Sequence, residues 1–125
     1  LEGGELRHAD HVRAAWGMLR LGGLEATLER YPKAIRHFAA SLGAASKFHA
    51  TITWAFLFLI HQRMAELGDA HEWSEFERAG PELFADHRAL LLRLYTAERL
   101  DSELARRSFL LPDRVASAHG REARG

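Results

Sequence analysis

The amino-acid sequence predicts an all-α protein, a compact bundle of four to five helices without a β-sheet. Apolar residues recur at spacings of three and four along most of the chain, which is the period of an amphipathic helix. Glycines separate these segments, and no alternating strand pattern occurs between them. A chain of 125 residues, 47% of them apolar, can build one core but not two ordinary domains. We expect one helical domain over residues 1–112 and a polar, mobile C-terminal tail over residues 113–125.

The first third of the chain predicts two helices. At 100° per residue, one face of the segment from Leu6 to Leu21 carries Val12, Ala15, Trp16 and Leu19. The glycine pair Gly22-Gly23 ends this helix. The segment from Leu24 to Leu42 has a single apolar stripe, which consists of Leu24, Leu28, Tyr31, Ile35, Phe38 and Leu42. Pro32 is expected to kink this second helix or to open a new one at its first turn.

The third helix is expected to begin at Ser46 as its N-cap and to end at Leu67. From Ile52 to Ile60 it is apolar nearly all round, which predicts a central position in the fold. This run is far shorter than the roughly 20 residues that span a bilayer. Trp54 and Phe58 lie on the side away from the main buried stripe, so either the C-terminal segment or another subunit must cover them. We expect a homodimer through these two aromatic residues.

The remainder of the chain predicts three more helical pieces. A short helix covers Glu72 to Ala79, and a long fourth helix follows Gly80-Pro81. One face of the long helix carries Leu83, Phe84, Leu90, Leu91, Leu94 and Tyr95. A last amphipathic piece begins at Thr96, docks through Leu100, Leu104 and Leu111, and ends at Pro112-Asp113.

Charge and composition exclude several classes of function. Lys plus Arg and Asp plus Glu both total 17, and no basic stripe interleaved with aromatics is present, which argues against nucleic-acid binding. The chain has no cysteine, so a metal would need histidine, carboxylate or tyrosine ligands. These features fit a cytoplasmic protein that does not enter a membrane.

Eight histidines raise the hypothesis of a metal or catalytic site. Four of them fall on polar faces or in polar connections and are expected to be solvated: His37, His61, His71 and His119. His8 and His11 belong to the apolar arc of the first helix. His49 falls on the same face as Thr53 and Phe56, which predicts that it is buried.

Helix direction predicts that three of these histidines meet. Short connections make consecutive helices antiparallel, so the first and third helices begin at one end of the bundle. His8, His11 and His49 should therefore converge there as metal ligands, with Phe38, Leu42, Thr53, Phe56 and Tyr95 lining the pocket. Three imidazoles leave an open coordination position, which suits one divalent transition metal such as zinc, copper or iron. The same three side chains can instead form a structural hydrogen-bond network.

His87 also lies in the apolar arc of its helix, between Leu83 and Leu90. At 1.5 Å per residue, a fourth helix that starts near Pro81 carries it only about a third of the way back toward His49. We interpret it as a core histidine. Tyr95 would come closer, and its phenol could act as a ligand, proton donor or hydrogen-bond partner.

Three segments resemble motifs of a family of small, uncharacterised bacterial helical proteins. They read HADHVRAAW from His8 to Trp16, KFHATIT from Lys47 to Thr53, and FLLPD from Phe109 to Asp113. The resemblance singles out His8, His11 and His49 and leaves His87 outside its motifs. It implies no activity or substrate.

Two functions of different classes follow from these patterns. The first is a small metal- or histidine-dependent enzyme that acts on an unknown small molecule at the histidine cluster. The alternative is a non-enzymatic helical interaction or binding module, in which the histidines are structural and the Trp54/Phe58 side meets a partner.

Overall fold

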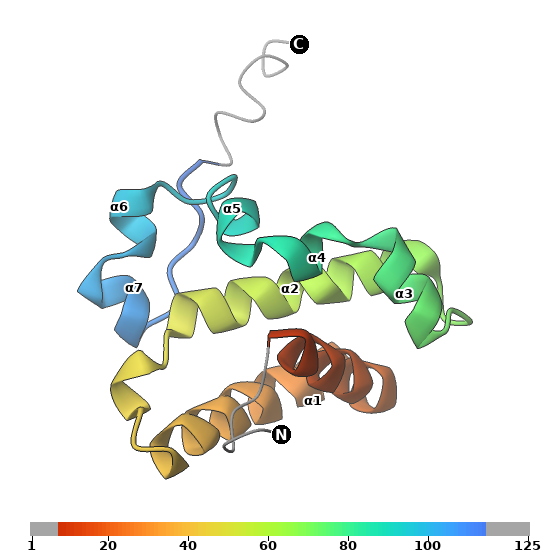
Figure 1. Cartoon of the computed structure of the whole chain (residues 1–125), viewed down its shortest axis with the longest axis horizontal. Helices are drawn as coiled ribbons and strands as arrows, with labels where there is room; N and C mark the ends of the chain where they lie inside the picture. Colours follow the sequence, from red (N-terminus) through yellow and green to blue (C-terminus); the bar gives the residue numbers. More distant parts are fainter. Residues whose placement is uncertain (1–7, 115–125) are drawn as a thin grey trace, which may run out of the picture.

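The computed structural model describes residues 8–114, and all the regular structure in that range is helical. The all-α class predicted from the sequence is therefore confirmed. Helix α2 (Ala50–Leu67) runs through the middle of the molecule, with α1 (His8–Ser41) on one side and most of the later helices on the other (Figure 1). Within residues 8–114, no helix has both the length and the apolar character that crossing a membrane requires.

Helix α1 consists of two arms that meet at Gly23, where the backbone has φ 82° and ψ 177°. The arms lie against each other, since the Tyr31 hydroxyl donates to the His11 carbonyl at 3.4 Å. The expected break at the glycine pair is confirmed. Pro32 opens no new helix: it is buried inside the second arm, which keeps helical dihedral angles through it.

Helix α2 begins three residues later than the sequence pattern predicts, since its N-cap is His49 and not Ser46. Ser46 belongs to a 3₁₀ turn, η2 (Ala45–Lys47), and the N-cap of α2 is His49. The cap works because Nδ1 of His49 accepts a hydrogen bond from the Ile52 backbone N–H at 3.1 Å. The end of the helix at Leu67 agrees with the expectation.

The short helix expected after α2 is present as α3 (Trp73–Ala79). The prediction of one long fourth helix is wrong, since the chain forms α4 (Glu82–Ala85) and α5 (His87–Leu91) with a break at Asp86. Asp86 adopts φ −148° and ψ 82°, and its carboxylate accepts a hydrogen bond from the Ala89 N–H at 3.0 Å. An aspartate cap thus interrupts a continuous apolar pattern.

Two further helices complete the described chain. Thr96 caps α6 (Ala97–Leu100), as expected, and Ser102 caps α7 (Glu103–Arg107). Leu100 is fully buried, but Leu104 and Leu111 are 52% and 68% exposed, so their predicted docking role is wrong. The buried residue of α7 is Ala105 instead.

The apolar core has two parts that share α2. The larger lies between α1, α2, α3 and α4, and its buried members are Val12, Ala15, Leu19, Tyr31, Phe56, Leu57, Ile60, Met64, Phe76 and Leu83. The smaller lies between α2 and the C-terminal half and consists of Ala55, Leu91, Tyr95 and Leu100.

The C-terminal segment (residues 108–114) is bound along α2 and the start of α6. The ring of Phe109 lies 5.8 Å from that of Trp54 and 6.0 Å from that of Phe58, so this segment covers the two aromatic residues. The Asp113 carboxylate accepts from the Thr96 N–H and hydroxyl, both at 2.8 Å. Asp113 and Arg114 therefore belong to the fold and not to the predicted tail, of which residues 115–125 lie outside the described range.

Candidate functional site: a histidine pocket

Three histidines from two distant segments line one pocket of about 170 Å³. His8 and His11 come from the first arm of α1, and His87 is the first residue of α5. The remaining walls come from α1 and α2 and are mostly apolar: Val12, Tyr31, Ile35, Ile52, Thr53, Phe56, Leu57 and Ile60. We call this cavity the histidine pocket.

His8 and His87 form a stacked pair. Their ring centroids are 4.1 Å apart with an angle of 20° between the planes, and the Phe56 ring meets His8 edge-on at 5.1 Å. Nε2 of His8 lies 2.8 Å from the Leu83 carbonyl oxygen, an acceptor, so Nε2 carries the proton. The His8 ring is thus held in the stack by its hydrogen bond to the Leu83 carbonyl and by its contact with the Phe56 ring.

The environment of His87 favours its neutral form. Burial lowers the pKa of His87 below its ordinary value of 6.5, and the charge of His8 lowers it further, while Asp86 acts weakly in the opposite direction. Two stacked imidazoles carry at most one positive charge comfortably, because two such charges at this separation repel in a poorly hydrated site. His87 is therefore an imidazole base at neutral pH.

Tyr31 contributes a neutral phenol to the wall. Burial raises the pKa of Tyr31 to about 12, so its hydroxyl stays protonated and donates to the His11 carbonyl. The Thr53 hydroxyl donates to the His49 carbonyl at 2.8 Å, which ties it to the first turn of α2. The histidines accordingly supply the basic groups of the pocket.

His49 does not line this pocket, contrary to the expectation from its helix face. Nδ1 accepts from the Ile52 N–H, so Nε2 must carry the proton, and it donates to the Leu100 carbonyl at 2.8 Å. Both ring nitrogens are engaged in holding α2 to α6. The prediction failed because the face was calculated for a helical residue, whereas an N-cap has a non-helical backbone.

Only two of the five predicted lining residues line the pocket. Thr53 and Phe56 line the pocket, as expected. Phe38 touches only its edge through the His11 ring at 6.4 Å, and Leu42 is 46% exposed. Tyr95 is buried in the smaller core cluster, where its hydroxyl donates to the Leu110 carbonyl at 2.7 Å.

The arrangement is poorly suited to the predicted metal centre. No group of three histidine or carboxylate side chains within residues 8–114 is placed to hold an ion. The lone pairs of imidazoles lie in the ring plane, so two nearly parallel rings such as His8 and His87 cannot both point at one ion about 2 Å away. The site fits acid–base chemistry or hydrogen bonding better than coordination.

His71 is a buried polar residue that the sequence pattern missed. It was expected to be solvated, but it is 5% exposed, accepts a hydrogen bond from the Trp16 indole at 2.9 Å, and donates through Nδ1 to the Gly68 carbonyl at 2.7 Å. Its position in a polar connection concealed this, because the contact with Trp16 spans 55 residues. His37 is exposed as expected, His61 is half-buried, and His119 lies outside the described residues.

The chain matches no known protein-family model, no curated protein and no solved structure. Its motif resemblance to small bacterial helical proteins stays a prediction, and its function has to be argued from the pocket.

Proposed function

We propose that the protein is a small histidine-dependent enzyme that acts by general acid–base chemistry on a small, largely apolar molecule with a hydroxyl group. One observation carries this proposal: an imidazole with a lowered pKa, His87, is stacked on a second imidazole inside a mainly apolar pocket. Perturbed titratable groups in concave apolar sites are characteristic of catalytic and binding sites.

The roles of the two histidines follow from their surroundings. Neutral His87 accepts the hydroxyl proton of the bound molecule, as a general base does. His8 keeps its place because its Nε2–H is bonded to the Leu83 carbonyl, and it shields one face of the His87 ring. A cavity of about 170 Å³ restricts the ligand to a few heavy atoms, and the Phe56 ring favours a flat apolar frame.

Phenol is a suitable first probe, because it combines a flat apolar ring with one acidic hydroxyl. Anisole has the same ring without the hydroxyl proton and serves as the matched ligand. We expect NMR titration to give tighter binding of phenol than of anisole, by about fivefold to tenfold for one buried hydrogen bond. The ring protons of His8 and His87 should shift in the phenol titration.

His87→Phe keeps the ring and the stack but removes the base. It should lose the preference for phenol over anisole while anisole still binds. His37→Gln, which changes an exposed histidine on the outer side of α1, should leave both affinities unchanged. Equal binding of phenol and anisole to the unaltered protein would contradict the proposed role of His87.

The metal-dependent form of the hypothesis requires His49 to leave its cap. One zinc, copper or iron ion on His8, His11 and His49 would need a ring nitrogen that now bonds Ile52 or Leu100. Elemental analysis of protein purified without a histidine tag tests this form. Stoichiometric metal that is lost in His49→Asn would favour it over the acid–base form, and we expect neither metal nor an effect of EDTA on the melting temperature.

The interaction-module alternative rests on the aromatic side of α2. Phe109 packs on both Trp54 and Phe58, which corresponds to the first of the two expected covers, the C-terminal segment. A homodimer through this side stays a prediction. Sedimentation of the unaltered protein and of Trp54→Glu would reveal it as a change from dimer to monomer.

A further inference from the structure

A second cavity, about 290 Å³, lies where the Gly23 break of α1 faces the C-terminal end of α2. It shares no lining residue with the histidine pocket. Leu19, Leu24 and Met64 form its apolar wall, and its polar groups are Arg20, His61, Asp69 and His71. We call it the hinge pocket.

Arg20 is held in place without being neutralised. Its guanidinium carbon lies 5.1 Å from the centre of the Trp16 ring, a cation–π contact. Its Nη1 lies 3.4 Å from Nε2 of His71, but that lone pair already accepts the Trp16 indole N–H at 2.9 Å. Nδ1 of His71 donates to Gly68, so the ring cannot turn to offer Arg20 a better acceptor.

No carboxylate within residues 8–114 forms an ion pair with Arg20. Most of the donors of a guanidinium fork are therefore available to a planar acceptor, and a carboxylate is the acceptor that the fork matches best. The indole and the imidazole preorganise the fork, which lowers the entropic cost of binding.

Asp69 supplies the opposite charge at the same pocket. It is exposed, and in the described part of the chain its carboxylate likewise pairs with no Lys or Arg. A dianion such as phosphate would be attracted by Arg20 but repelled by Asp69. A zwitterion would satisfy both groups.

We infer that the hinge pocket binds a free amino acid with an apolar side chain. The α-carboxylate pairs with Arg20, the α-ammonium group pairs with Asp69, and the side chain packs on Leu19, Leu24 and Met64. His61, on α2, also lines this cavity and adds a polar group to its wall. The inference does not depend on the histidine pocket.

Isothermal titration with L-leucine tests this inference, with two analogues that each lack one charge. Isocaproate keeps the carboxylate and the apolar chain but has no ammonium group, and L-leucinamide keeps the ammonium group but has no carboxylate. We expect L-leucine to bind, and each analogue to bind about tenfold or more weakly, since a hydrogen bond to a charged group is lost. Inorganic phosphate should not compete.

Arg20→Gln and Asp69→Asn should each weaken L-leucine binding by about tenfold or more. Asp69 is exposed, so its variant keeps the fold even if Arg20→Gln does not. Arg13→Gln is the matched control, because Arg13 also lies on the first arm of α1 with its guanidinium 4.9 Å from a tryptophan ring, that of Trp73, but outside the pocket.

Three results would overturn the inference: no binding of L-leucine, equal binding of leucinamide or isocaproate, or unchanged affinity in both Arg20→Gln and Asp69→Asn. The phenol titration at the histidine pocket is unaffected by any of them, so the two proposals fail separately.

Discussion

The charge state of His87 couples the histidine pocket to the stability of the fold. Burial and the His8 charge lower the pKa of His87 in the folded protein, whereas the unfolded chain titrates it near 6.5. Between these two pKa values the unfolded chain binds more protons, so acid favours unfolding. The contribution of His87 to the free energy of unfolding is constant above about pH 6.5 and falls as the pH drops through the folded pKa.

We predict that His87→Gln reduces this loss of stability in acid. Urea unfolding at pH 7.5 and 5.5, with His37→Gln as control, measures it. The difference in the free energy of unfolding between the two pH values should be smaller in His87→Gln than in the unaltered protein. It should stay unchanged in the control, whose histidine is exposed. An identical pH dependence in all three proteins would mean that the pocket does not hold His87 neutral.

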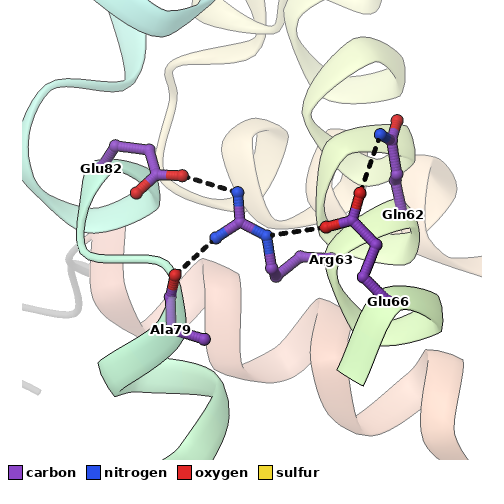
Figure 2. Close-up of polar contacts among 5 residues, drawn as sticks. All are labelled: Gln62, Arg63, Glu66, Ala79 and Glu82. Atoms are coloured by element: carbon purple, nitrogen blue, oxygen red, sulfur yellow. Dashed lines mark hydrogen bonds and ion pairs between the residues drawn. The ribbon is translucent and has the colours of Figure 1, made fainter. Parts of the chain in front are cut away.

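Gly80 is required by the side chain of Arg63. Arg63 donates to the Ala79 carbonyl at 2.7 Å and to Glu82 at 2.7 Å, and it also pairs with Glu66 (Figure 2). A Cβ at position 80 would lie 2.8 Å from Nη1 of Arg63 and 3.0 Å from a methyl group of Leu83. The guanidinium cannot withdraw without losing the contacts that join α2 to α3 and α4.

We predict that Gly80→Ala lowers the free energy of unfolding by about 1–2 kcal/mol. Gly17→Ala is the matched control: its Cβ would meet nothing within 4 Å on a helical backbone, so it should raise stability by about 0.5–1 kcal/mol. Denaturant unfolding distinguishes the two signs. An unchanged free energy of unfolding in Gly80→Ala would show that Arg63 is not held as tightly as its bonds indicate.

At the scale of elements, one threonine binds the C-terminal segment to α2. Thr51 is fully buried, its hydroxyl donates to the Ser108 carbonyl at 2.8 Å, and it accepts from the Leu110 N–H at 3.1 Å. The Thr53 hydroxyl, two residues on, bonds only the carbonyl of His49, four residues earlier in the chain. The first is a link between elements and the second is local.

We predict that Thr51→Val costs about 2 kcal/mol, because two backbone groups lose their partner, while Thr53→Val costs less than about 1 kcal/mol. Hydrogen exchange of the Leu110 amide should accelerate in the first variant only. Similar losses in both variants would indicate that segment 108–114 is held by its apolar contacts alone.

The period of apolar residues was sufficient to predict most helices but not their ends. It predicted α3 and the end of α2 correctly, and it also predicted correctly that His8 and His11 face inward. It failed where a single cap decides the backbone. A cap at His49 moved the start of α2, and a cap at Asp86 divided the expected fourth helix.

The same two caps explain which part of the candidate site was predicted. His49 does not belong to the site, because an N-cap residue has a non-helical backbone and the calculated helix face does not apply to it. His87 entered it because α4 packs on α1 and ends at Asp86, which leaves His87, the first residue of α5, stacked on His8. The height argument for one straight helix could not include this break. The contact between Trp16 and His71 arises only from tertiary packing, which a periodicity analysis of separate segments does not describe.

For the molecule as a whole, the break in α1 determines where both pockets lie. Because the two arms fold back at Gly23, His11 and Tyr31 meet across the arms and form one wall of the histidine pocket. The break itself lines the hinge pocket. A straight α1 would remove both cavities and expose the apolar stripe of its second arm.

Gly23 makes this fold possible through its backbone alone. Its φ of 82° and ψ of 177° belong to a region that residues with a Cβ rarely adopt, yet a Cβ there would meet no other atom within 4 Å. We predict that Gly23→Ala lowers the free energy of unfolding by about 1–3 kcal/mol and weakens phenol and L-leucine binding together. Gly17→Ala, on the same helix, should leave both ligands bound, as titration of the three proteins would reveal. Loss of one ligand without the other in Gly23→Ala would mean that the arms can adjust at one pocket independently of the other, and that the angle between them does not determine both sites.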